Sequence, residues 1–170
     1  VFDTLNAKAG IMAVEEAAEA IGREVPLMLS MTITDLSGRN LSGHTVEAFW
    51  HAVRHARPLT VGLNCSFGAQ QLRPHVQALG PIADTLIMAY PNAGLPNELG
   101  AYDEQPNETA GFIREWAQGG LVNIVGGCCG STPAHIAAMA EAVRGLPPRR
   151  LPQVERRTRL AGLEPMTLAA

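Results

Sequence analysis

Apolar and polar positions follow two alternating periodicities along the chain. Apolar residues at helical spacing predict helices, and short apolar runs bounded by Gly, Pro and Asn predict strands. The predicted helices cover 6–21, 45–55, 69–79, 107–118 and 133–143, and the predicted strands cover 26–33, 59–64, 85–90 and 121–125. Five methionines fit apolar faces and are expected in the core: Met12, Met28, Met31, Met88 and Met139. Strands separated by helices indicate parallel βα units.

Two α/β architectures produce this alternation, an open doubly wound sheet and a (β/α)8 barrel. The barrel is favoured because candidate functional residues follow several different strands, and because no glycine-rich nucleotide fingerprint follows an early strand. A whole barrel takes about 250 residues, so we predict roughly its second half over 1–146. Residues 1–3 look like the end of a further strand. The Pro- and Arg-rich stretch that follows, 147–170, predicts an interdomain linker or a strap along the domain surface.

The composition narrows the class of protein. The chain has 170 residues, of which 46% are hydrophobic and 17% are charged, with a net charge of −3. This balance supports a folded core and indicates neither a nucleic-acid partner nor a membrane span. Three cysteines, two of them adjacent, fit reduced thiols in the cytoplasm better than a disulfide scaffold.

The three cysteines stand where predicted strands end. Cys65 follows the run 59–64, while Cys128 and Cys129 follow the run 121–125. Catalytic zinc sites use three protein ligands and keep a fourth position open, so this placement predicts a zinc site. Adjacent strand residues point to opposite faces. Cys128 and Cys129 can therefore share an ion only where the chain has left strand geometry.

Glycines around the cysteine pair are expected to supply that freedom: Gly126, Gly127 and Gly130. Three other interpretations of the cysteines stay open. They are small buried apolar side chains, a vicinal redox pair, or part of an anion cradle over 126–132 at a helix N-terminus, which lacks the Lys of a P-loop.

Two asparagines are candidates for substrate contact. Asn64 and Asn92 each stand where a predicted strand meets its loop. A side-chain amide there can accept a hydrogen bond from a substrate ammonium or donate one to a carboxylate. The alternative is a turn residue. His51 and His55 are four apart on a predicted helix, and we expect them on its solvated face.

The cysteine motifs resemble those of a known family. The segment 125–130, followed by Thr132 and Pro133, resembles the zinc signature of the homocysteine-binding domain of homocysteine S-methyltransferases, and 62–65 resembles its upstream ligand segment. Within that family, segments 1–8, 32–35 with 37–39, 90–96, 124–127 and 159–165 are most similar to the cobalamin-dependent methionine synthases.

The resemblance implies a (β/α)8 TIM barrel that this chain enters at the end of strand 4 and leaves after helix 8. It implies zinc held by Cys65, Cys128 and Cys129, and homocysteine as substrate; we expect substrate contacts from Asn64, Asn92, Gly126 and Gly127. It further implies methylcobalamin as methyl donor, bound by another domain and charged from 5-methyltetrahydrofolate, and a tail leading toward a folate-binding domain. An acidic substrate-binding residue of the family would precede Val1.

Two other functions remain open from the sequence. One is a cobalamin-independent methyltransferase that uses betaine or S-methylmethionine with the same zinc site. The other is an inactive zinc-binding fragment, since half a barrel leaves raw sheet edges and an uncovered interior.

Overall fold

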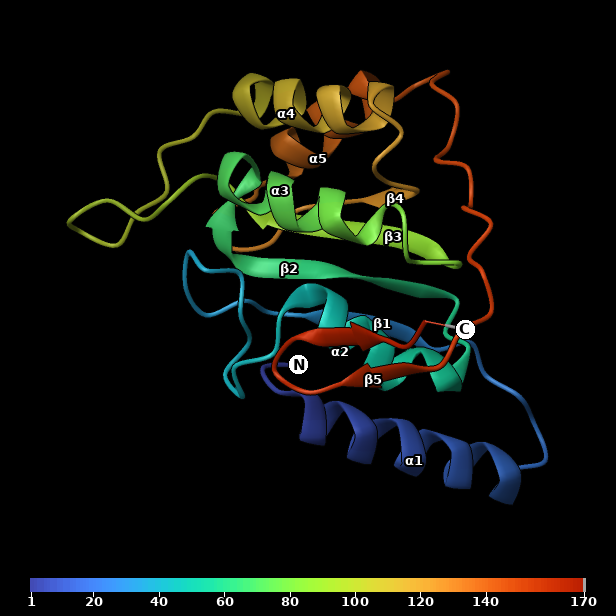
Figure 1. Cartoon of the computed structure of the whole chain (residues 1–170). Helices are drawn as coiled ribbons and strands as arrows, with labels where there is room; N and C mark the ends of the chain where they lie inside the picture. The colour runs from blue at the N-terminus through green and yellow to red at the C-terminus, as the bar shows by residue number, and fades with distance from the viewer. Residues whose placement is uncertain (170) are drawn as a thin grey trace.

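The computed structural model describes residues 1–169 as a parallel sheet flanked by helices (Figure 1). The helices are Thr4–Ala20 (α1), Val46–Val53 (α2, extended by the 3-10 turn η1, Arg54–Ala56), Ala69–Leu79 (α3), Pro106–Gln118 (α4) and Pro133–Ala142 (α5). The strands are Met28–Met31 (β1), Thr60–Gly68 (β2), Leu86–Asn92 (β3) and Ile124–Val125 (β4), with a hairpin of Arg159–Ala161 (β5) and Pro165–Thr167 (β6). The predicted α/β alternation is confirmed.

Strands β1 to β4 lie side by side in chain order, and every pairing is parallel. A doubly wound sheet reverses its strand order at a switch point, and no reversal occurs among these four strands. Val1 adds to the free edge of β1, because its N–H group donates to Ser30 O at 2.7 Å and its carbonyl accepts from Thr32 N at 2.8 Å. That is the hydrogen-bond pattern of a parallel pair, so Val1 lies where a preceding strand would pair with β1, whereas the Phe2 carbonyl accepts from Leu41 N and Asp3 already caps α1.

One face of the sheet carries the hydrophobic core. Met31, Leu63 and Ile87 are fully buried on neighbouring strands. The helices supply the other large members of this cluster: Phe49, Trp50, Leu72, Ile113 and Trp116. The opposite, inner face holds Ser30, Asn64 and Tyr90, which are only half-buried.

Three of the five methionines are buried as predicted, namely Met31, Met88 and Met139. The prediction is wrong for Met12 and Met28, which are 62% and 49% exposed. Helix α1 is buried only along the stripe of Thr4, Ala7 and Ile11, so an apolar residue on its other face meets no partner among the described residues.

Strand β4 is shorter than the predicted run. Asn123 takes the place of a ladder residue, because its side-chain oxygen accepts from Ile87 N at 2.9 Å while its own N–H donates to Ile87 O at 2.8 Å. The strand therefore has only two residues before the cysteine loop begins. Within residues 1–169, no helix is both long and apolar enough to cross a membrane.

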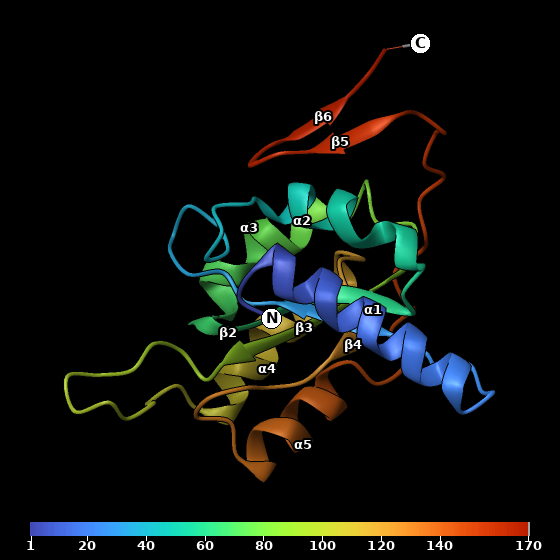
Figure 2. The same cartoon turned by 90° about the horizontal axis from the view of Figure 1, so that it is seen from below.

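The tail crosses the amino ends of the strands before it returns to α2 (Figure 2). Arg149 is 5% exposed, and its guanidinium donates to the carbonyls of Gly80, Ala83 and Thr85. The β5–β6 hairpin, which the sequence did not predict, packs on α2, and Thr45 N donates to Leu163 O at 3.0 Å.

Candidate metal centre

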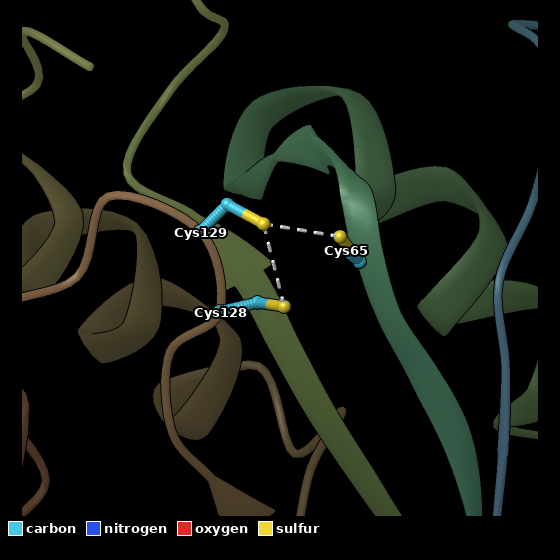
Figure 3. Close-up of side chains that lie close together, drawn as sticks. All are labelled: Cys65, Cys128 and Cys129. Atoms are coloured by element: carbon cyan, nitrogen blue, oxygen red, sulfur yellow. Dashed lines mark hydrogen bonds between the residues drawn. The ribbon is translucent and has the colours of Figure 1, made fainter. Parts of the chain in front are cut away.

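Cys65 occupies a distorted stretch of β2. Strand β2 continues to Gly68, but Cys65 and Ser66 have φ angles of 64° and 63°, and the register with β3 shifts between Asn64 and Gly68. A left-handed conformation costs a non-glycine residue about 1–2 kcal/mol, and such strain is concentrated at functional sites. The distortion breaks the alternation of the strand and presents the Cys65 thiol to the loop after β4 (Figure 3).

The loop that carries Cys128 and Cys129 is fastened to the end of β3. Cys128 N donates to Pro91 O at 2.8 Å, and Ala93 N donates to Cys129 O at 2.9 Å. Cys129 N donates to the side-chain oxygen of Asn92 at 3.1 Å. These three bonds fix the backbone of both cysteines without regular strand pairing.

The glycines of this loop have two different roles. Gly130 has a φ of 77°, so it supplies the predicted conformational freedom. Gly126 and Gly127 have no positive φ, which corrects the expectation for these two residues. They are needed for close packing, because an added Cβ would lie 2.8 Å from the Tyr90 ring at Gly126 and 2.1 Å from the Ser131 hydroxyl at Gly127.

The three thiols converge (Figure 3). Cys65 Sγ lies 3.4 Å from Cys129 Sγ, which lies 4.0 Å from Cys128 Sγ, and all three sulfurs are within 4.8 Å of one another. Zinc–sulfur bonds of about 2.3 Å in a tetrahedron place ligand sulfurs about 3.8 Å apart. The donor set and its spacing therefore fit a zinc ion with one coordination position free. Within residues 1–169 this is the only convergent group of three His, Cys, Asp or Glu side chains.

The thiols affect one another's ionisation. Burial acts to raise the pKa of Cys65, but hydrogen bonds from Ser66 N–H and from the other two thiols outweigh it, so the pKa lies below its ordinary value. Burial and then the hydrogen bond and charge of Cys65 raise the pKa of Cys128 to about 11. Crowded thiols cannot all ionise at neutral pH unless a cation balances them.

Tyr102 and His135 contact the segment that follows the cysteine pair. The Tyr102 ring packs on Gly130 so closely that a Cβ there would be 2.4 Å away, and partial desolvation followed by the nearby thiols raises the pKa of Tyr102. His135 is buried; its Nδ1 accepts from Thr132 N at 3.2 Å and its Nε2 donates to Glu104 O at 2.9 Å. The spacing of a helix-capping box could have predicted the hydrogen bond between Thr132 and His135.

The predicted asparagines both lie at the rim. Asn92 is 2% exposed and holds Cys129, as described above. Asn64 precedes Cys65 and is hydrogen-bonded to Ser30 at 2.5 Å. The histidine prediction is half correct: His55 is exposed, but His51 is half-buried, because the hairpin strand β5 packs on α2.

A large surface hollow lies elsewhere. It has a volume of about 1040 Å³ and is lined by the C-terminal end of α1, the segment before β1 and the segment before β2, including Gly22, Leu27 and Arg57. None of the three cysteines lines it. The convergent thiols, rather than the size of a hollow, therefore identify the candidate site.

The known proteins that this chain resembles are homocysteine methyltransferases. Residues 1–143 match the family model described as homocysteine S-methyltransferase. The structure is similar to the apo crystal structure of the homocysteine methyltransferase MmuM from Escherichia coli, with 25% sequence identity and a TM-score of 0.56. The match covers 78% of this chain and 45% of the E. coli chain, so this chain spans less than half of that relative. The chain belongs to the homocysteine S-methyltransferase family.

Proposed function

We propose that this chain activates the thiol of homocysteine at a zinc ion for methyl transfer from methylcobalamin, giving methionine. The observation that carries the proposal is the convergence of Cys65, Cys128 and Cys129 within 4.8 Å. The family match and the likeness to a homocysteine methyltransferase support the substrate. The methyl group would come originally from 5-methyltetrahydrofolate.

The chain's own residues would supply the metal ligands and the contacts that hold them in position. The three cysteines would hold the metal, and three of four tetrahedral positions would then be filled. Bound zinc would keep a coordinated substrate thiol deprotonated, which makes the sulfur the nucleophile. Asn92 and the backbone of β3 hold the cysteine loop in place, and Tyr102 packs against Gly130 beside the thiols.

We further propose that the chain is the second half of a (β/α)8 barrel, with 147–170 leading toward a folate-binding domain and cobalamin bound by another domain of the same enzyme. The sequential strand order and the pairing of Val1 with β1 support the half barrel. Its 45% coverage of the E. coli relative supports it as well. Reduced, clustered thiols are consistent with a cytoplasmic enzyme.

Metal content and methyl transfer test the proposal together. Zinc per chain is measured for the wild type, for Cys65→Ala, Cys128→Ala and Cys129→Ala, and for Ser66→Ala as the matched control. We expect each cysteine variant to lose zinc and homocysteine methylation, and the control to keep zinc. A cysteine variant with unchanged zinc content would refute the site, and a preference for betaine or S-methylmethionine over methylcobalamin would refute the donor.

A further inference from the structure

The side-chain amide of Asn64 has a defined orientation on the inner face of the sheet. Its Oδ1 accepts a hydrogen bond from the Ser30 hydroxyl at 2.5 Å and a longer one from the Thr32 hydroxyl at 3.4 Å. A separation of 2.5 Å lies in the range of O–H···O bonds and below that of N–H···O bonds. The atom that faces Ser30 is therefore the amide oxygen, and the amide nitrogen points away from both hydroxyls.

The amide nitrogen of Asn64 is left as an unused donor. Within the described residues Nδ2 makes no side-chain hydrogen bond, and Asn64 is only half-buried, so a ligand can reach it. An amide NH2 group donates two hydrogen bonds and accepts none. A ligand group that pairs with this nitrogen must therefore be an acceptor.

Asn64 lies beside the candidate metal centre. It directly precedes Cys65, so the two Cα atoms are about 3.8 Å apart. In the sheet Asn64 pairs with Tyr90, and the Tyr90 ring lies against Gly126 at the start of the cysteine loop. The amide thus belongs to the row of inner-face residues nearest the thiols.

The inner-face positions that precede Asn64, toward the amino ends of the strands, are filled by side chains. Met88 packs against Gly62, where an added Cβ would lie 2.6 Å from Met88 Cγ, and the Thr60 hydroxyl donates to the Met88 sulfur at 3.1 Å. Thr60 and Met88 are both buried. A small ligand whose sulfur is held at the cysteines therefore cannot extend below Asn64 on this face.

We infer that Asn64 binds the carboxylate of the substrate, an inference that rests on the proposed function. Homocysteine has three polar groups. Its thiol is assigned to the metal, its ammonium group can only donate, and its carboxylate can only accept. The free N–H groups of Asn64 match the carboxylate and exclude the ammonium. Ser30 and Thr32 are positioning residues, because they hold the amide oxygen and thereby aim the nitrogen.

Substrate analogues that each lack one polar group test this assignment. Binding to the zinc-loaded protein is measured by calorimetry for homocysteine, for 4-mercaptobutanoate, which lacks the ammonium, and for 3-aminopropane-1-thiol, which lacks the carboxylate. We expect Asn64→Ala to raise the Kd of both carboxylate ligands about tenfold to a hundredfold, as for loss of a hydrogen bond to a charged group, and to leave the amino thiol unchanged.

Two further variants keep the test independent of folding. Asn64→Asp preserves the shape but replaces the donor with a negative charge, so it should weaken the carboxylate ligands more than Asn64→Ala and favour the amino thiol. Asn107→Ala, an exposed asparagine on α4, should change no Kd. Equal losses for all three thiols, or a loss confined to the amino thiol, would overturn the assignment of Asn64. Failure of the zinc-loaded wild type to bind any thiol would instead overturn the proposed function and the inference with it.

Discussion

The side-chain oxygen of Asn92 accepts a hydrogen bond from the backbone N–H of Cys129 at 3.1 Å. This bond joins the last residue of β3 to the most exposed of the three cysteines. Cys65 comes from β2, so the candidate zinc site combines a ligand from β2 with two ligands from the loop after β4, and β3 lies between these two strands. Asn92 therefore helps to hold two of the three sulfur donors at the right distance from the third.

Replacing Asn92 should weaken zinc binding more than folding. Asn92→Ala removes the acceptor from a partly buried N–H group, and loss of such outer-shell partners typically costs 10–100-fold in metal affinity. We expect a zinc Kd raised by about that factor in a competition titration with a chelator. Asn107→Ala is the control, and a zinc Kd for Asn92→Ala within about twofold of the wild type would contradict this role of the bond.

Gly130 should tolerate no side chain while Tyr102 is present. Gly130→Ala places a Cβ at 2.4 Å from the Tyr102 side chain and a non-glycine residue at a φ of 77°. We expect a loss of about 1–3 kcal/mol in the free energy of unfolding, together with weaker zinc binding. Urea unfolding and the chelator titration measure the two effects.

A double variant separates the two causes at Gly130. Tyr102→Gly removes both the ring and the Cβ that the new methyl group would strike, so Tyr102→Gly/Gly130→Ala should relieve the clash and retain only the backbone cost of about 1–2 kcal/mol at position 130. If the two single effects simply add in the double variant, the close packing of Tyr102 on Gly130 does not matter.

Most of the fold could be predicted from local patterns. Helix α3 matches its predicted range of 69–79, and Thr132 with Pro133 marked the start of α5. These elements follow apolar periodicity and capping, which are properties of neighbouring residues. The convergence of the three cysteines was predicted as well, because parallel strands bring their carboxyl ends to one edge.

The missed features depend on contacts between distant segments. The left-handed backbone at Cys65 has no signal in a Thr-Val-Gly-Leu-Asn run, since it is imposed by the surrounding structure. The packing of Tyr102 on Gly130 joins residues that are 28 positions apart in the sequence, with helix α4 and strand β4 between them. The β5–β6 hairpin lies in a stretch rich in Pro and Arg whose strand character is weak, and it depends on its contacts with α2.

Arg149, although it lies in the tail, should contribute strongly to the free energy of unfolding. Its buried guanidinium donates to three backbone carbonyls, those of Gly80, Ala83 and Thr85. Arg149→Ala leaves these acceptors without their partner, and we expect a loss of about 2–4 kcal/mol in urea unfolding. The exposed neighbour Arg150 is the matched control, and Arg150→Ala should stay within about 0.5 kcal/mol. Equal effects of the two variants would show that the tail does not stabilise the sheet through Arg149.

His51 should make the protein less stable as the pH falls. Burial, then the charges of Arg159 and Arg54, lower the pKa of His51 in the folded state against the partial opposition of Glu47, and its Nδ1 is buried without a hydrogen-bond partner among the described residues. Burial likewise lowers the pKa of His75. Since the unfolded chain binds these protons more readily, with an ordinary pKa near 6.5, the free energy of unfolding is highest above that value and decreases as the pH falls below it.

Substitutions of His51, His55 and His75 isolate the part of this pH dependence that belongs to His51. Urea unfolding at pH 7.5, 6 and 5 should show a shallower decrease for His51→Gln than for the wild type, because glutamine takes up no proton beneath the β5–β6 hairpin. His55→Gln changes an exposed residue at the end of the same helical segment and should follow the wild-type profile. His51→Gln/His75→Gln should be flatter than either single variant, since both histidines lose a favourable neutral environment when they are protonated. A His51→Gln profile parallel to that of the wild type would mean that the proton is taken up elsewhere.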